Sequence, residues 1–148
     1  MRRGIRIALD LGSSRVGIAK CDPDGILATP IEVCNPEELP IRLTSLISEF
    51  EPLEVLIGLP IDLKGQSGVA ADNVLQVATA LAKANPEIIF RLVDERLTTK
   101  VARGQLRTSG YTTRTDKQLI DAVAASVLLE DALEYERRNQ NPPGQVLQ

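Results

Sequence analysis

Apolar and polar positions alternate over the first third of the chain in a pattern typical of β-strands. Three such runs, Ile5–Leu11, Val16–Cys21 and Ile26–Cys34, are separated by the turn sequences GSS and DPDG. Short turns of this kind join strands that run antiparallel to each other. The pattern therefore predicts an antiparallel meander of three strands.

The middle of the chain changes between helical and strand-like patterns. Apolar residues at helical spacing predict a helix over Pro40–Phe50, which Pro52 ends. The nearly all-apolar run LEVLIGLP follows and is typical of a strand buried on both faces. An alanine-rich helix over Val69–Ala84 then leads to another strand, IIFRLVDE.

Two helices are predicted after this strand, at about Thr98–Thr108 and Asp116–Arg137. Thr115 and Gln118 have the spacing of a capping box at the start of the second helix. We therefore predict an α/β protein with a mixed five-stranded sheet, an antiparallel meander followed by parallel strands, flanked by helices. One domain is expected over residues 1–138, and the sequence NQNPPGQVLQ indicates a flexible tail over residues 139–148.

The composition narrows the classes of function. The chain has 148 residues and no apolar run of the roughly 20 residues that cross a bilayer, and its basic start leads into a strand, so a cytoplasmic protein is expected. It contains no histidine, which excludes the usual zinc sites and every histidine-dependent nucleophile. The two cysteines, Cys21 and Cys34, are expected to be small buried side chains. Any bound metal ion must therefore be held by oxygen atoms.

Charge is distributed unevenly along the chain. The formal net charge of the whole chain is -3, whereas residues 91–117 carry seven basic and three acidic side chains. This local excess of positive charge suits the phosphate backbone of a nucleic acid. An ordinary solvated helix face would give the same pattern, so charge alone leaves both interpretations open.

Acidic residues stand at the ends of two predicted strands. Asp10 ends the first strand, at the carboxyl edge where α/β sheets bind ligands, although a turn residue before Gly12 would look the same. Asp94 and Glu95 end the last strand and point to opposite faces, so only one of them can join Asp10. The alternative is that both are structural, one pairing with Arg96 and the other serving the following helix.

Asp121 lies along the apolar stripe of the last predicted helix, where a carboxylate needs a partner. One alternative is an acid at the edge of the stripe that pairs with a lysine or arginine. If Asp121 instead meets Asp10 and one acid of the other strand end, the carboxylates repel one another unless a cation lies between them. Magnesium prefers such oxygen ligands, and a pair of ions about 4 Å apart suits phosphodiester hydrolysis. We therefore interpret Asp10 as a metal ligand.

Four stretches of the chain together resemble the YqgF/RuvX family of RNase H-like proteins. In order they are ALDLGSSRVGIA, VLIGLPIDLKGQSG, DERLTTKVA and IDAVAASVLLEDAL, and they extend from Ala8 to Leu133. The resemblance implies an RNase H-like fold and an endonuclease that uses Mg²⁺ or Mn²⁺. It also implies maturation of the 5′ end of precursor 16S rRNA in ribosome biogenesis, with Holliday-junction cleavage as the alternative.

Carried over by position, the resemblance implies catalytic and metal-binding roles for Asp10, Glu95 and Asp121. Substrate contacts are expected from a glycine-rich turn and from basic or hydroxyl side chains: Arg15, Gly65, Gly68, Arg96, Thr98, Lys100 and Arg103. The chain departs from the family pattern at Asp62, where asparagine is expected.

Two other functions are compatible with the sequence. DLGSS also resembles the phosphate loop of the actin, Hsp70 and sugar-kinase superfamily, but an ATP site there needs two lobes and 148 residues supply one. A nucleic-acid-binding or ribosome-assembly adaptor would keep the fold without catalysis. The expected partners are precursor rRNA or structured DNA and ribosomal subunit precursors, with no membrane, for a monomer or a homodimer.

Overall fold

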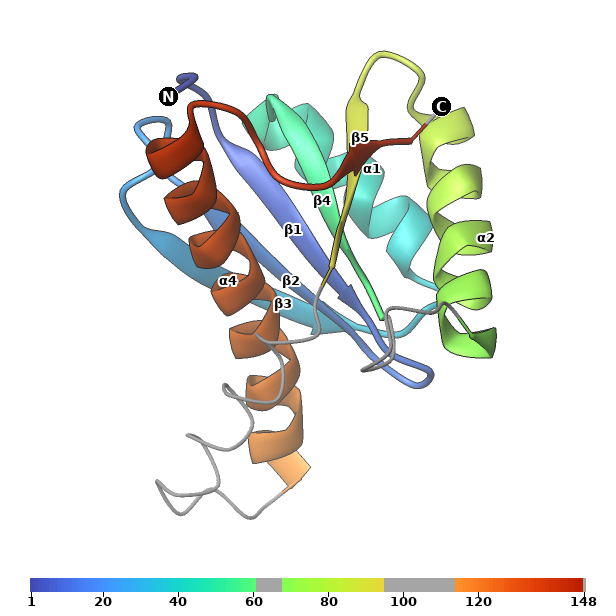
Figure 1. Ribbon diagram of the computed structural model, residues 1–148. Coiled ribbons are helices and arrows are strands. Elements are labelled where there is room, and N and C mark those ends of the chain that lie inside the picture. Colours follow the sequence, from blue (N-terminus) through green and yellow to red (C-terminus); the bar gives the residue numbers. More distant parts are fainter. Residues whose placement is uncertain (61–67, 95–113, 148) are drawn as a thin grey trace.

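Strands from both halves of the chain form one mixed sheet (Figure 1). The computed structural model describes residues 1–60, 68–94 and 114–147, with side chains of the last range described from residue 120. The strands are β1 (Arg6–Leu11), β2 (Val16–Cys21), β3 (Ala28–Cys34), β4 (Glu54–Leu59), β5 (Ile89–Asp94) and β6 (Gln145–Val146), in the order β3-β2-β1-β4-β5-β6. Strands β1 to β3 pair antiparallel, whereas β1–β4 and β4–β5 are parallel. The predicted meander followed by parallel strands is confirmed.

The sheet has six strands, so the predicted count of five is wrong. Gln145 and Val146 pair antiparallel with β5, and the N–H of Leu147 donates to the carbonyl of Phe90 at 2.8 Å. Gly144 has a φ of 76° and lies so close to the Leu92 carbonyl that no side chain would fit. Two paired residues after two prolines are too few to give an alternating pattern, so the sequence does not reveal this strand. The expected domain boundary at residue 138 stays a prediction.

Strand β3 begins two residues later than predicted. The Asp22 carboxylate accepts hydrogen bonds from the backbone N–H groups of Ile26 and Leu27, at 2.8 and 2.7 Å. These bonds hold both residues in the turn, where their side chains are exposed. The local side-chain bonds of Asp22 therefore override the β propensity of the two apolar residues.

Helices cover both faces of the sheet. Helices α1 (Leu39–Phe50) and α2 (Val69–Ala84) pack on one face, and α4 (Arg114–Asn139) crosses the other (Figure 1). The bounds of α2 agree with the prediction, and α4 extends the predicted helix by two residues at each end. The helix predicted over Thr98–Thr108 lies outside the described residues. None of the helices in the described ranges is long and apolar enough to cross a membrane.

Alternation along β1 separates two cores. Ile7 and Leu9 point toward α1 and α2, where they join the larger apolar cluster. Ala8 points to the opposite face and packs with Leu128 and Leu129 of α4. Asp10 has the parity of Ala8, so the register of the strand places its carboxylate on the α4 face.

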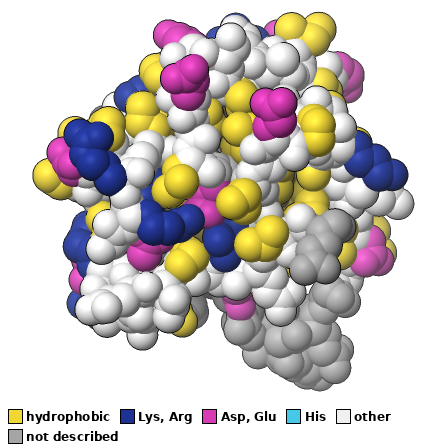
Figure 2. All heavy atoms as spheres, turned by 90° about the horizontal axis from the view of Figure 1, so that it is seen from above, with side chains coloured by type: hydrophobic (Ala, Val, Ile, Leu, Met, Phe, Trp, Pro, Cys, Tyr) yellow, Lys and Arg dark blue, Asp and Glu magenta, His cyan; other side chains and the backbone are white. Residues whose placement is uncertain are grey.

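Buried charges connect the sheet to the C-terminal half of α4. Glu136 bonds to Arg2 Nη2 at 2.5 Å and to Arg6 Nη2 at 2.8 Å, and Glu54 bonds to Arg2 Nη2 at 2.9 Å and to Arg91 Nε at 3.0 Å. Figure 2 looks onto this end of the molecule, where acidic and basic side chains lie against one another among apolar ones. We call these five residues the Arg–Glu network. Because Arg91 is engaged there, it is not part of a solvent-exposed basic surface.

Candidate functional site

Asp10 and Asp121 meet on the α4 face of the sheet, where β1 ends. Asp10 is paired across the strands with Gly17 of β2, and directly opposite residues of this kind have Cα atoms about 4.5–5.5 Å apart. The backbone of Asp121 lies directly against Gly17, so close that a Cβ there would overlap the Asp121 carbonyl oxygen. Both acidic residues are buried, at 6% and 8% exposure. Because Gly17 has no side chain, α4 can pack directly against β2, and this close packing brings Asp121 next to Asp10.

Arg15 supplies a positive charge to this region. Its Nε donates to Asp121 Oδ2 at 2.6 Å, the geometry of a charge-assisted hydrogen bond. Arg15 ends the tight β1–β2 turn, which the N–H of Gly12 closes by donating to the Arg15 carbonyl at 2.9 Å. The pairing of Asp121 with an arginine matches the alternative considered from the sequence. Asp121 therefore has a positively charged side chain of the same chain beside it.

The register of β5 distinguishes Asp94 from its neighbour. Asp94 has the parity of Phe90 and Leu92, whose side chains pack in the α1/α2 core, and it is paired with Leu59, which packs there as well. Asp94 therefore lies on the face opposite to Asp10. Glu95, the other acid of the pair, lies outside the described residues.

The remaining predicted contacts fall largely outside the described residues. These are Gly65, Arg96, Thr98, Lys100 and Arg103, together with Asp62. Gly68 is described and is the N-cap of α2, with an extended backbone and open space where a Cβ would lie. Neither strain nor crowding requires glycine at this position, and its role in binding stays a prediction.

The described residues supply some, but not all, of the ligands that a hard divalent cation needs. Asp10 and Asp121 offer carboxylate oxygens on one face, which are the ligands that Mg²⁺ and Mn²⁺ prefer. Arg15 already provides one positive charge at Asp121, as expected of a carboxylate that needs a cation. No group of three or more acidic or cysteine side chains that could hold a metal occurs among residues 1–60, 68–94 and 120–147. The third expected ligand, Glu95, is not among those residues.

The cysteines take no part in this chemistry. Cys21 and Cys34 are both buried, as predicted, and they are not bonded to each other. Burial raises the pKa of each thiol, so both remain protonated near neutral pH. Neither residue is therefore suited to act as a nucleophile.

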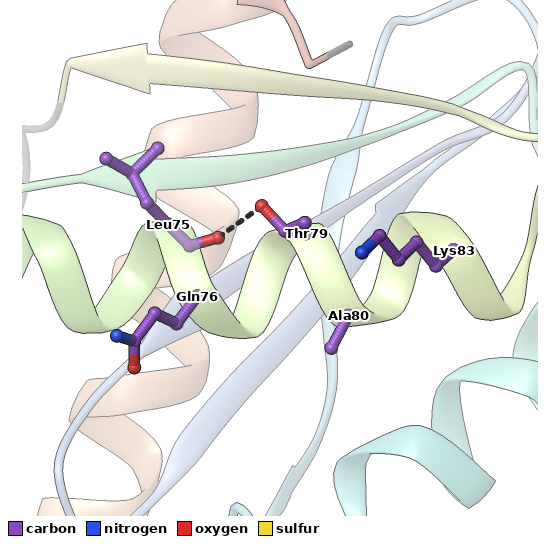
Figure 3. A pocket seen from close by; sticks show the side chains of 5 residues that line it. All are labelled: Leu75, Gln76, Thr79, Ala80 and Lys83. Atoms are coloured by element: carbon purple, nitrogen blue, oxygen red, sulfur yellow. Dashed lines mark hydrogen bonds between the residues drawn. The ribbon is translucent and has the colours of Figure 1, made fainter.

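Two of the surface hollows formed by the described residues lie on the α2 side of the sheet, opposite the paired acids. One, of about 150 Å³, lies between the β1–β2 turn and the first turns of α2, and Leu11 lines it from the α1/α2 face. The other lies along α2 (Figure 3), where Thr79 Oγ1 donates to the Leu75 carbonyl at 2.7 Å and Lys83 is the one charged residue. All five residues that line it come from one helix, and none is acidic. Neither hollow provides a better candidate for phosphodiester chemistry.

Gly17→Ala is expected to damage both stability and activity. The new methyl group would displace α4 from β2, which costs about 1–3 kcal/mol by overpacking and moves Asp121 away from Asp10. Chemical denaturation and a cleavage assay measure the two effects. Gly68→Ala is the control for the stability measurement alone: its methyl group enters open space, so it should lower the free energy of unfolding by less than Gly17→Ala does, although alanine is a poorer N-cap than glycine. Equal stabilities for the two variants would show that the contact between Gly17 and α4 is looser than described.

The chain was compared with known protein families. The family model RuvX, described as Holliday junction resolvase, matches residues 4–135. The chain belongs to the RuvX family. The resemblance inferred from the four sequence stretches is thereby confirmed.

Relatives of this RuvX family member cover nearly its whole length. A protein of Streptomyces coelicolor is 47% identical over 98% of this chain and 89% of its own length. A protein of Thermobifida fusca is 43% identical over 100% of this chain and 98% of its own length. Both carry the name "Putative pre-16S rRNA nuclease".

A solved structure supports the fold assignment. Thermus thermophilus RuvC in complex with a Holliday junction substrate has a TM-score of 0.60, with 13% sequence identity, 97% of this chain covered and 99% of that one. A second RuvC structure from the same organism gives a TM-score of 0.55 at 14% identity. The RuvX family member therefore has the predicted RNase H-like fold.

Two features of this site were not predicted from the sequence. The sequence left open an arginine or lysine partner for Asp121 but did not identify Arg15, which is 106 positions away. Gly17 was treated as an ordinary strand residue, although glycine inside a strand often marks the close approach of another backbone. That signal was present in the run VGIAKC and could have identified the helix contact.

Proposed function

We propose that this RuvX family member is a metal-dependent endonuclease that hydrolyses phosphodiester bonds in precursor 16S rRNA, in maturation of its 5′ end. The observation that carries the proposal is the meeting of Asp10 and Asp121 over Gly17, at the carboxyl edge of the sheet. The names of relatives that match nearly the whole chain support the choice of substrate. Such a substrate implies action in the cytoplasm on ribosomal subunit precursors.

Asp10, Asp121 and Glu95 are the residues that would hold Mg²⁺ or Mn²⁺. The parity of β5 puts Asp94 on the α1/α2 side of the sheet, which supports Glu95 as the acid of that strand end that joins the site. When bound, a divalent ion activates water and stabilises the negative charge that develops during phosphodiester hydrolysis. The acids fix where the scissile phosphate must lie, because two of them are held by a strand and by a helix packed against it.

The basic residues would hold the nucleic-acid backbone beside the acids. We include Arg15, Arg96, Lys100 and Arg103 in this role, with Thr98, Gly65 and Gly68 as further contacts. Arg91 is left out because it is bound to Glu54 inside the Arg–Glu network. The basic surface is therefore smaller than the sequence count of residues 91–117 implies.

Holliday-junction cleavage is the second candidate. It is favoured by the description of the family that matches residues 4–135. Both candidates require the same acids and the same metal, so the site geometry is compatible with each. They differ in the shape of nucleic acid that must reach the carboxyl edge of the sheet.

A substrate panel separates the candidates. Purified protein is incubated with precursor 16S rRNA, a four-way DNA junction and linear duplexes, in Mg²⁺, in Mn²⁺ and in a chelator. We expect metal-dependent cleavage of the precursor rRNA, no cleavage with chelator, and little cleavage of the junction. Cleavage of the junction alone would reverse the order of the two candidates. Tight binding of either substrate without cleavage in any metal would favour a non-catalytic adaptor.

A further inference from the structure

Arg15 and Asp121 form an asymmetric pair. The acid stands on α4, which is packed onto the sheet, and its side chain is only 12% exposed. The arginine stands at the end of the β1–β2 turn, and its side chain is 36% exposed. Gly12, Ser13 and Ser14 of the same turn are exposed as well. Asp121 is therefore held in place by the packing of α4, whereas the Arg15 side chain approaches it from the solvent side.

A divalent ion bound at Asp121 would compete with the guanidinium of Arg15 for the same carboxylate. Asp121 Oδ2 accepts the short bond from Arg15 Nε, and an oxygen engaged in such a bond has less electron density to offer a metal. A guanidinium remains charged at every working pH, so it also repels a second cation brought to the same group. Binding of a divalent ion at Asp121 therefore has to displace Arg15 or work against its charge.

We propose that Arg15 is a built-in counter-ion that holds Asp121 in the metal-free protein and gives it up when a divalent ion binds. The inference rests on the proposed function, because it takes Asp121 to be a metal ligand. In the metal-free protein Arg15 supplies a positive charge beside the buried Asp121 carboxylate, which the apolar residues of α4 cannot supply. It also sets the metal affinity lower than the acids alone would give. In the metal-free protein Arg15 is thus a positioning residue that acts through Asp121, and once released its guanidinium is available for the backbone contact proposed above.

The test measures Mn²⁺ affinity by titration calorimetry without nucleic acid. We expect Arg15→Gln to bind Mn²⁺ at least about fivefold more tightly than the parent, because the competing charge is gone. Arg15→Lys keeps the charge and should stay near the parent value. Mn²⁺ should also raise the melting temperature of Arg15→Gln more than that of the parent, while the metal-free variant is slightly less stable. A purely structural ion pair would lower stability without tightening metal binding.

Arg42→Gln is the matched control. Arg42 bonds to Glu32 at 2.6 Å, the same length as the Arg15–Asp121 bond, and its side chain is 40% exposed. It stands on α1, on the opposite face of the sheet. Arg42→Gln should therefore leave the affinity for Mn²⁺ unchanged. If Arg42→Gln and Arg15→Gln both bind Mn²⁺ more tightly by the same factor, the gain comes from the change in net charge, and the proposal is overturned.

Asp121→Asn separates failure of the inference from failure of the proposed function. One outcome would reject only the counter-ion role. In that outcome the parent binds Mn²⁺ and Asp121→Asn fails to bind it, but Arg15→Gln binds no more tightly than the parent, so the metal site stands. If neither the parent nor Arg15→Gln binds Mn²⁺, the metal site itself is wrong. Binding that appears only in Arg15→Gln would support the competition directly.

Discussion

Asp10→Asn and Asp121→Asn are each expected to lower cleavage by roughly two orders of magnitude or more. Each change keeps the shape of the side chain and removes a negative charge that the proposed metal site requires. Glu95→Gln should have the same effect. Single-turnover cleavage of precursor 16S rRNA at saturating protein measures the loss, because it separates the chemical step from substrate binding.

The free energy of unfolding provides the second readout for these variants. Asp10→Asn should leave stability unchanged or raise it, because removing one charge from neighbouring acids relieves repulsion. Asp121→Asn should cost no more than about 1 kcal/mol, because the Arg15 side chain is a third exposed and the ion pair is screened by water. Large early unfolding of all variants, with normal activity of the folded fraction, would mean that these acids are structural.

Asp94→Asn is the matched control on β5. Asp94 adjoins Glu95 in sequence but lies on the opposite face from Asp10, so its variant should cleave normally. Loss of activity in Asp94→Asn with normal cleavage by Glu95→Gln would show that the assignment of faces along β5 is wrong. The comparison tests a prediction that the sequence alone left open.

The sheet and its helices could be predicted because burial dictates their pattern. Apolar residues recur at strand spacing in β1 and β2 and nearly fill β4, and α2 repeats Ala71, Val74, Ala78 and Leu81 along one side. The sixth strand could not be predicted, because its two residues have no pattern of their own and depend on the free edge of β5. Asp10 and Asp121 were predicted to meet, and the structure places both against Gly17.

The Arg–Glu network was missed although its signal was present. Arg6 is the first residue of β1, Arg91 lies inside β5, and Glu54 starts β4 between them, although all three side chains are buried. A charge at an interior strand position needs a partner of opposite sign. The partner Glu136 is 130 residues from Arg6 in sequence, so its identity could not be deduced from spacing.

Glu136→Gln is expected to destabilise the protein by about 3 kcal/mol, toward the lower end of the roughly 3–5 kcal/mol for breaking a buried pair. Arg6 is 1% exposed and would lose the negative charge that it faces, while Arg2, at 35% exposure, could turn to water. The amide of glutamine still accepts one hydrogen bond, which limits the loss. For a chain of this size we expect the melting temperature to fall by roughly 6–12 °C.

Glu134→Gln is the control two residues away on the same helix. Glu134 bonds to Arg138 at 2.8 Å, but the two side chains are 47% and 76% exposed. Exposed pairs of this kind contribute less than about 1 kcal/mol. Thermal denaturation of both variants compares a buried and an exposed carboxylate on α4. Similar small decreases in melting temperature would show that burial does not strengthen the Arg–Glu network.

The pH dependence of stability distinguishes the charge of Glu136 from its packing. Burial opposes ionisation of Glu136, but the hydrogen bond from Arg2 and the charges of Arg6 and Arg2 outweigh it and lower the pKa from its ordinary 4.5. The unfolded chain therefore binds a proton at a higher pH than the native protein does, so the contribution of Glu136 is complete above about pH 4.5 and is lost as the pH falls further. The difference in unfolding free energy between the parent and Glu136→Gln should be constant from pH 7 to about 5 and shrink at lower pH. A difference that stays the same down to pH 3 would mean that packing, rather than charge, accounts for the loss.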